Sequence, residues 1–225
     1  CRPEAGPQRD SALTLYPRLP MSAATLFGLF RHGQTIWNKQ KRVQGRLDSP
    51  LTPEGVAAVR EWARFLASPR WNWARIITSP TPRASATARL INEQLHVEIE
   101  EEDDLREQDW GIWEGLSWSE IAENSAEMLQ EQIEKGWSFR PPQGESRAEV
   151  RSRARSVLSS YGHKYSGEQI LVVTHQGVIK SLVYSIEKRL FLPEEPKLID
   201  NNRLQTISCC NDTLTGFAYN IQLSA

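Results

Sequence analysis

Short apolar runs alternate along this chain with segments in which apolar residues recur every three or four positions. A short run bounded by turn residues is typical of a buried strand, and the longer spacing is typical of a helix packed on one side. The clearest helix begins at Thr52-Pro53, since threonine caps helices, proline suits the first turn, and Val56, Val59 and Ala63 follow on one face. The expected strands are 25–30, 74–79, 97–101 and 169–175, with a terminal hairpin of 204–210 and 214–223; the expected helices are 52–66, 81–95, 117–133, 146–161 and 177–190.

Residues 103–145 interrupt this alternation. They are acidic, rich in tryptophan and contain one expected helix. A long insertion between regular elements is typical of an active-site lid. Strands alternating with helices predict an α/β fold with a largely parallel sheet. We therefore expect a single domain over 23–225 that carries a helical lid insertion at about 108–145.

The start of the chain differs in composition from the rest. Its first twenty residues contain four prolines and three arginines, without periodicity and without the apolar segment of a signal peptide. We expect 1–22 to be a disordered tail or upstream sequence, with Met21 as the natural start. Cys1 leaves lipidation open as an alternative.

Composition narrows the function classes. The chain has 27 basic and 28 acidic residues and a net charge of −1, which gives no basic surface for nucleic acid. Its apolar runs are shorter than the roughly 18 residues of a membrane span. Cys1, Cys209 and Cys210 form no disulfide framework, which suits a reducing compartment. We expect a cytoplasmic protein that binds neither nucleic acid nor membrane.

Two expected strands end in similar chemistry. The first runs into Arg31-His32-Gly33 and the fourth into His175-Gln176-Gly177. In open α/β sheets, ligands bind outside the carboxyl ends of the strands. A helix that begins near Gly177 would direct its N-terminus into the same crevice and favour an anion. The pattern predicts two histidines facing one anion-binding site.

Further polar residues follow strands at the same edge. Arg83 lies in the first turn after the second strand, and together with Arg31 it would suit a phosphate dianion. Thr35 and Asn38 lie just beyond His32 and can add hydrogen bonds. Glu107 follows the third strand, where a carboxylic acid can protonate a leaving group. Each residue alone has an ordinary structural explanation, but four strand ends carrying these groups together favour phosphoryl chemistry.

Metal chemistry is the rival interpretation. The four histidines, His32, His96, His163 and His175, show no i,i+2 or i,i+4 pairing, and the chain contains no CxxC or HExxH motif. Walker-type and GxSxG motifs are also missing. We expect no metal and no cofactor.

Six motifs in order resemble those of the histidine phosphatase superfamily, the phosphoglycerate mutase-like family with the RHG signature. The resemblance covers about 25–185 and includes RHGQTIWN, VQGRLDSPLTPEG, TSPTPRASATA, LREQDWGIWEG, PPQGES and VVTHQG. Two motifs depart from the family pattern: THQG replaces a form closer to SHGG, and TSPTPR replaces SSPLxR. Neither departure removes a catalytic group, so they bear on specificity.

The resemblance implies a three-layer α/β/α fold with helices on both faces of the sheet, and a reaction without metal. It implies that His32 becomes phosphohistidine and that Glu107 donates the proton. Arg31, Arg83 and a protonated His175 would hold the phosphate. The implied substrate-binding set is Arg31, Thr35, Asn38, Gln44, Gly45, Arg83 and Gln176.

Two reactions remain open within the family. A mutase needs a closed cationic pocket, whereas the segment between Glu107 and Arg140 has only one basic residue, Lys135, with many acids and four tryptophans. We therefore expect a phosphomonoester hydrolase, with a mutase as the alternative and a non-catalytic phospho-ligand binding module as the rival class. The substrate would be a small phosphomonoester, with α-ribazole phosphate as one candidate because of the tryptophans. Phosphate or sulfate should occupy the pocket, and the protein is expected to be a monomer or homodimer.

Overall fold

The computed structural model describes residues 24–223, so the predicted tail at 1–22 lies outside the described residues. Its centre is one six-stranded mixed sheet with the order β3-β2-β4-β1-β5-β6. The first four strands in that order are parallel, and the last two are antiparallel to their neighbours. The strands are β1 (Thr25–Arg31), β2 (Trp73–Thr78), β3 (Glu98–Glu101), β4 (Gln169–Thr174), β5 (Leu204–Cys210) and β6 (Thr213–Ile221).

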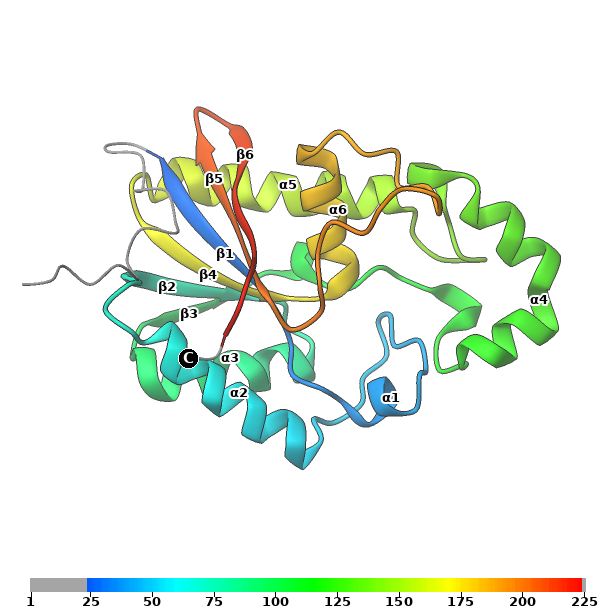
Figure 1. The fold of residues 1–225 in the computed structure, drawn as a ribbon, viewed down its shortest axis with the longest axis horizontal. Helices are drawn as coiled ribbons and strands as arrows, with labels where there is room; N and C mark the ends of the chain where they lie inside the picture. Colours follow the sequence, from blue (N-terminus) through cyan, green and yellow to red (C-terminus); the bar gives the residue numbers. More distant parts are fainter. Residues whose placement is uncertain (1–23, 224–225) are drawn as a thin grey trace, which may run out of the picture.

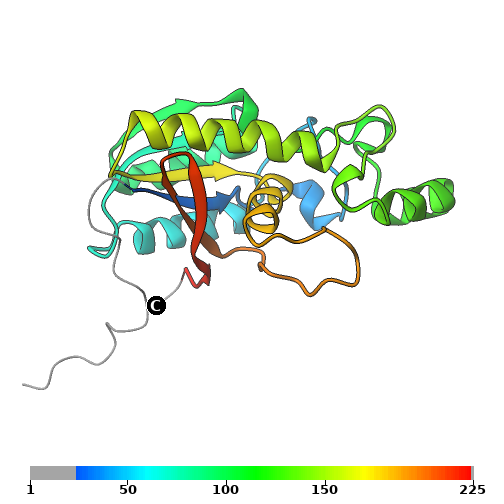
Figure 2. The ribbon, with the colours of Figure 1, turned by 90° about the horizontal axis from the view of Figure 1, so that it is seen from above.

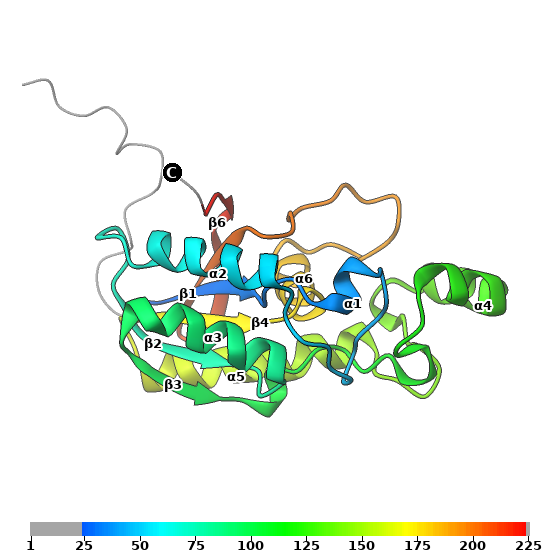
Figure 3. The same ribbon diagram turned by 90° about the horizontal axis from the view of Figure 1, so that it is seen from below.

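Helices cover both faces of the sheet, which confirms the three-layer prediction. Figures 1 and 3 show α2 (Pro53–Leu66) and α3 (Pro82–Leu95) on one face, with α5 (Arg147–Lys164) and α6 (Gln176–Ile186) on the other. Because side chains alternate along a strand, neighbouring residues enter different cores. In β1, Leu29 packs in the core of α5 and α6 and Phe30 in that of α2 and α3.

Local capping explains why the helices begin where the sequence predicts. The side chains of Thr52, Ser117 and Ser146 each accept a backbone N–H three residues on, and the last two form complete capping boxes. The predicted end of the last helix at 190 is wrong. The helix α6 ends at Ile186, and Lys188 turns into the left-handed region (φ 54°). Residues 187–188 are exposed, so no burial holds a further turn.

The lid forms a separate layer at one end of the molecule. Its main helix, α4 (Trp118–Ile133), lies far from β5 and β6 in all three ribbon views, and Figure 2 shows it from above. Val43, Trp113, Ile121 and Phe139 form a small core of the lid's own. The lid therefore packs as a structured unit rather than as a loose loop.

The four lid tryptophans divide into two kinds. Trp113 is buried in the lid core, and Trp137 packs against the core of α5 and α6 while its Nε1–H donates to the carbonyl of Arg189 at 2.7 Å. Trp110 and Trp118 instead line a pocket. Among the helices of residues 24–223, none combines the length and apolar composition that a membrane crossing requires.

Candidate active site

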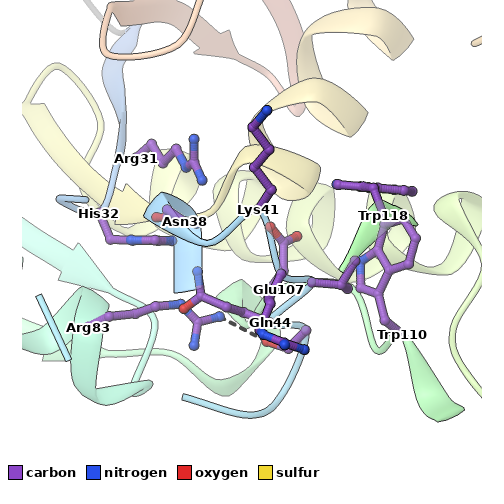
Figure 4. A pocket seen from close by; sticks show the side chains of 12 residues that line it. Arg31, His32, Asn38, Lys41, Gln44, Arg83, Glu107, Trp110 and Trp118 are labelled. Carbon is purple, nitrogen blue, oxygen red and sulfur yellow. Dashed lines mark hydrogen bonds between the residues drawn. The ribbon is translucent and has the colours of Figure 1, made fainter. Parts of the chain in front are cut away.

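The pairing of β1 with β4 brings the two histidines together. Arg31 lies opposite Thr174 in the parallel register, and the backbone N–H of His32 donates to the carbonyl of Thr174 at 3.0 Å. The residues that follow these strand ends, His32 and His175, have ring centroids 5.1 Å apart and ring planes 59° apart. His32 lines a pocket of about 330 Å³, shown in Figure 4, whereas His175 is fully buried and is not part of that lining.

The pocket lining combines residues from five separate parts of the chain. It includes the predicted residues Arg31, His32, Asn38, Gln44, Gly45, Arg83 and Glu107, together with Lys41, Arg42, Val43, Trp110 and Trp118.

His32 is oriented by its own neighbour. Its Nδ1 lies 2.8 Å from the carbonyl oxygen of Gly33, and since a carbonyl only accepts, Nδ1 carries the proton and Nε2 is left with a free lone pair. Burial, followed by the charges of Arg31 and Arg83, holds the pKa of His32 well below its ordinary value of 6.5. The ring is therefore neutral and nucleophilic, as the proposed chemistry requires.

His175 is held by two hydroxyls. Its Nε2 lies 2.9 Å from Ser79 Oγ and 3.1 Å from Thr81 Oγ1, while its buried Nδ1 has no hydrogen-bond partner among the described residues. Burial, followed by the positive charge of Arg83, holds the pKa of His175 well below 6.5, which favours the neutral ring over the protonated one that we expected. In the tautomer in which the hydroxyls donate to Nε2, the neutral ring carries its proton on Nδ1 and offers one donor.

Arg83 is fixed before any ligand arrives. Its Nη1 donates to Leu47 O at 2.7 Å and to Asp48 Oδ1 at 2.9 Å, and its Nη2 donates to Gly45 O at 2.8 Å. The side chain is fully buried, and its Nε has no partner in the described part of the chain. One edge of the guanidinium, formed by Nε and the second Nη2 proton, is therefore left for an oxyanion.

Arg31 completes a set of unsatisfied donors. Its Nε is also buried without a partner among residues 24–223. Burial lowers the pKa of this guanidinium from its ordinary value, the charge of Glu107 raises it, and that of Arg83 lowers it. Buried donors normally find acceptors. The Nε atoms of Arg31 and Arg83 and the Nδ1 of His175 thus form a group that a phosphate dianion would satisfy.

Glu107 is positioned by backbone groups. Its Oε1 accepts the N–H of Gln108 at 2.9 Å, and its Oε2 accepts the N–H of Gly177 at 3.1 Å, in the first turn of α6. Arg153 of α5 donates to the carbonyl of Glu107 at 3.2 Å and pairs with Glu145 at 2.7 Å. A Cβ on Gly177 would collide with the Glu107 carboxylate, which explains the glycine there. Each carboxylate oxygen keeps one lone pair for a proton or a leaving group.

The remaining predicted residues divide between the pocket and its support. Thr35 does not line the pocket: it caps α1 (Ile36–Lys39), and Asn38 returns its Oδ1 to the Thr35 N–H at 3.2 Å. Asn38 does line the pocket. Gln44 is buried with its Oε1 unpaired in the described chain, and Gly45 contributes the carbonyl that holds Arg83. Gln176 begins α6 outside the pocket lining, with its Nε2 unpaired there too.

Several functional residues escaped the sequence analysis. Asp48, which anchors Arg83, lies 35 positions from it and carries no local signal. Ser79 and Thr81 directly follow the carboxyl end of β2. A search for polar residues after strand ends would therefore have included them. Lys41 and Arg42 lie between the RHGQTIWN and VQGRLDSPLTPEG motifs, and the sequence analysis did not consider them.

Two carboxylates near Glu107 have structural roles. Glu114 accepts the backbone N–H groups of Arg46, Leu47 and Trp110 at 2.7, 3.1 and 3.1 Å. Asp109 accepts the N–H of Gly111 at 2.8 Å, and neither carboxylate lines the pocket. In residues 24–223, no three His, Cys, Asp or Glu side chains are grouped to hold a metal ion.

This geometry agrees with a comparison against protein families. The model of the histidine phosphatase superfamily (branch 1) matches residues 27–220. Because the match covers most of the chain, the chain belongs to this superfamily, and it is an enzyme of the phosphatase type.

Individual relatives are consistent with that class. The chain is 33% identical over 158 residues to "Uncharacterized phosphatase PhoE" of Bacillus subtilis, which covers 70% of this chain and 75% of that protein. It is also 33% identical to "Probable phosphoglycerate mutase GpmB" of Salmonella paratyphi C, over 70% of this chain and 73% of that one. Among solved structures, Bacillus stearothermophilus YhfR superposes with a TM-score of 0.78 at 28% identity, covering 89% of this chain and 98% of YhfR.

Proposed function

We propose that this protein is a phosphomonoester hydrolase that works through a phosphohistidine at His32. The observation that carries the proposal is the orientation of one ring nitrogen. The Nδ1 proton is engaged by Gly33 O, which leaves a neutral Nε2 beside the unsatisfied donors of Arg31, Arg83 and His175. A nucleophile next to an oxyanion site is what phosphoryl transfer requires.

In the first step, Nε2 of His32 attacks phosphorus and the bond to the ester oxygen breaks. Arg31, Arg83 and the Nδ1–H of His175 stabilise the negative charge on the equatorial oxygens. Glu107 gives its proton to the departing oxygen, which leaves as an alcohol. The phosphoryl group is then attached to His32, and Glu107 is ionised.

In the second step, water attacks the phosphoryl group from the side that the alcohol has left. Ionised Glu107 takes a proton from this water, and the P–N bond breaks. Inorganic phosphate is released, the lone pair returns to Nε2 of His32, and Glu107 is protonated again. Each residue thus returns to its starting state without a metal.

The residues of the pocket wall favour hydrolysis of a phosphomonoester over isomerisation of a phosphoglycerate. Arg42 is already engaged, with its Nη1 donating to Gly115 O at 2.7 Å and Glu120 Oε2 at 3.0 Å. Lys41 is the feature that favours the alternative, because it brings a cation to the pocket wall from outside the lid. A single exposed lysine is a weak site for a second phosphate dianion.

The same wall supports an aromatic or apolar leaving group. Trp110 and Trp118 line the pocket and meet edge to face, with centroids 5.4 Å apart and planes at 90°. Trp118 keeps 47% of its surface exposed, which leaves it open to stack on a substrate. An α-ribazole-like phosphate remains a candidate on this ground.

The test is to capture the intermediate. Incubation with a radiolabelled aryl phosphate after exhaustive EDTA treatment should give acid-labile, base-stable label on His32 and undiminished turnover. The His32→Asn variant should give neither. Activity that EDTA removes and Mg²⁺ or Zn²⁺ restores, or turnover that survives in His32→Asn, would overturn the proposal.

The mutase alternative has its own assay. Conversion of 3-phosphoglycerate to its isomer should be negligible beside hydrolysis of aryl phosphates, with or without the bisphosphate. Efficient isomerisation in a coupled assay would reverse the assignment in favour of the mutase.

A further inference from the structure

A second cavity lies behind the active site, between α6, the start of α5 and the segment 187–203. We call it the rear cavity; it measures about 330 Å³ and its lining includes Ile133, Arg147, Lys180, Phe191, Glu195 and Lys197. None of these residues lines the active-site pocket. The two cavities therefore share no lining residue.

The rear cavity carries unbalanced positive charge. Arg147 and Lys180 have no ion-pair partner in residues 24–223, whereas Lys197 is paired with Asp200 at 2.8 Å. The one acidic side chain in the lining, Glu195, uses its two oxygens to accept the N–H groups of Leu190 and Leu192 at 2.9 and 3.0 Å. The described lining thus holds one carboxylate, Glu195, against three cations, and Glu195 forms no ion pair with Arg147 or Lys180.

This arrangement is unfavourable for the cations themselves. Burial lowers the pKa of Arg147 to about 10, and burial together with the charges of Arg147 and Lys197 lowers that of Lys180. Both side chains are partly buried, and a cation held away from water without an ion-pair partner is uncommon unless a ligand uses its charge.

Hydrogen bonds and aromatic rings hold the guanidinium of Arg147 in place. Its Nη1 donates to Gly136 O at 3.1 Å and to Phe191 O at 3.0 Å. Its guanidinium lies 4.2 Å from the ring centres of both Phe139 and Phe191. Phe191 adopts a φ of 67°, which is strained for an aromatic residue and is sustained by its surroundings. The cation is thus fixed at the cavity wall at a cost in backbone strain.

We propose that the rear cavity binds a small organic anion, with a carboxylate or phosphate head group at Lys180 and Arg147 and an apolar body along Ile133 and Phe191. The head group would supply the anionic partner that both cations lack, and the aromatic and aliphatic lining suits the body. Lys180 also interacts electrostatically with Glu107 and Arg31, so a bound anion alters the field at the active site. The proposal does not rest on the hydrolytic function.

Fluorine NMR titration tests this site with 4-fluorobenzoate, 4-fluorophenylphosphonate and the neutral 4-fluorobenzamide. Wild-type protein should bind at least one anion saturably and should not bind the amide. Lys180→Met should weaken anion binding by about tenfold or more, because the charged partner is lost. Lys135→Met is the matched control, since Lys135 lies close in sequence to Ile133, is paired with Glu131 at 2.7 Å and does not line the cavity.

Two further readouts keep the result interpretable. Lys180→Met should raise the melting temperature by about 2–4 °C, because it removes a buried unpaired charge. Anion binding should persist in Arg31→Met, which disables only the active site. Equal affinity in wild type and Lys180→Met, loss of binding in Arg31→Met, or no saturable binding below about 10 mM would overturn the proposal. The benzoate and phosphonate results separate the two head groups.

Discussion

At the scale of single residues, one threonine at the site gives up helix capping in order to contact a histidine. Thr81 occupies the N-cap of α3 but makes no capping bond, because its hydroxyl bonds His175 instead. Thr52, at the N-cap of α2, caps in the ordinary way. The difference between these two Thr-Pro helix starts marks the one that lies at the catalytic edge of the sheet.

The role of Glu107 gives a prediction that depends on the leaving group. Glu107→Gln keeps the size of the side chain but has no proton to donate, so phosphorylation of His32 by an alkyl phosphate should slow by roughly 10²–10⁴. The effect should be much smaller for p-nitrophenyl phosphate, whose leaving group needs little help. Because the base for the second step is also lost, quenched-flow should show a nitrophenol burst.

The control for this experiment is Asp104→Asn, in the same acidic stretch but exposed and outside the pocket lining. It should behave as wild type with both substrates. Equal slowing of both substrates by Glu107→Gln, without a burst, would show that Glu107 is not the proton donor.

The environment of His32 predicts where acid inactivates the enzyme. A base whose pKa is lowered takes up its proton only at lower pH, so the ring stays neutral as the pH falls through 6.5. The acid limb of histidine phosphorylation should therefore lie well below pH 6.5. Proton NMR of the ring, assigned by comparison with His32→Gln, measures the same ionisation directly. A midpoint at or above 6.5 would contradict the assignment of a buried neutral nucleophile.

At the scale of elements, the lid and the phosphate pocket are joined through one carboxylate. Glu114 accepts the backbone N–H groups of Arg46 and Leu47, and Gly45 approaches it so closely, at a φ of 53°, that no Cβ fits. The carbonyls of Gly45 and Leu47 in turn hold Arg83. The lid thus fixes the loop that fixes the phosphate-binding arginine.

Glu114→Gln tests this connection. The amide retains one acceptor oxygen for three backbone donors, so the free energy of unfolding should fall by about 1–3 kcal/mol. Displacement of the loop should lower kcat/KM for aryl phosphates by at least about tenfold, chiefly through kcat. Chemical denaturation and steady-state kinetics measure the two effects.

Glu149→Gln provides the comparison, because Glu149 caps α5 through Ser146 and lies away from the pocket. It should lose stability without losing kcat/KM. A Glu114→Gln variant that is destabilised but fully active would limit Glu114 to a purely structural role.

At the scale of the whole molecule, the sheet edge concentrates buried titratable groups and makes folding depend on pH. His32 and His175 are buried and their pKa values are lowered. Just below pH 6.5 these two histidines therefore bind more protons in the unfolded chain than in the native protein. Stability therefore rises with pH between the native pKa values and 6.5. Each histidine should contribute a slope of about 1.4 kcal/mol per pH unit in that window.

Urea unfolding at several pH values in phosphate-free buffer measures this slope. His175→Asn, whose amide does not titrate, should reduce the slope by the share of one histidine. If wild type and variant lose stability in parallel below pH 6.5, His175 is not held neutral in the native protein.

Much of the fold followed from local pattern. The strand predicted at 169–175 corresponds to β4, and the helix predicted at 52–66 corresponds to α2, because burial on both sides or on one side leaves a readable period. The one-turn helix α1 was missed, since four residues are too short for periodicity. The overlong end assigned to α6 arose because nothing local signals where packing stops.

The candidate site likewise contains features that the sequence predicted and features that it did not. The strand-end argument brought His32, His175, Arg83 and Glu107 to one edge. In the structure His32, Arg83 and Glu107 line one pocket, and the ring of His175 lies 5.1 Å from that of His32. The anchor of Arg83 at Asp48 and the neutral state of His175 were not predictable. They depend on burial and on partners that lie far away along the chain.

The sequence by itself determined the alternation of elements, the α/β class and the chemical groups at the strand ends, because these depend on residues close together in the chain. Only the tertiary structure decided which lid tryptophans face the pocket, how Glu114 ties the lid to Arg83, and that Arg147 and Lys180 share a second cavity. These features depend on contacts and electrostatic fields between segments far apart in sequence. Such interactions exist only once the chain has packed.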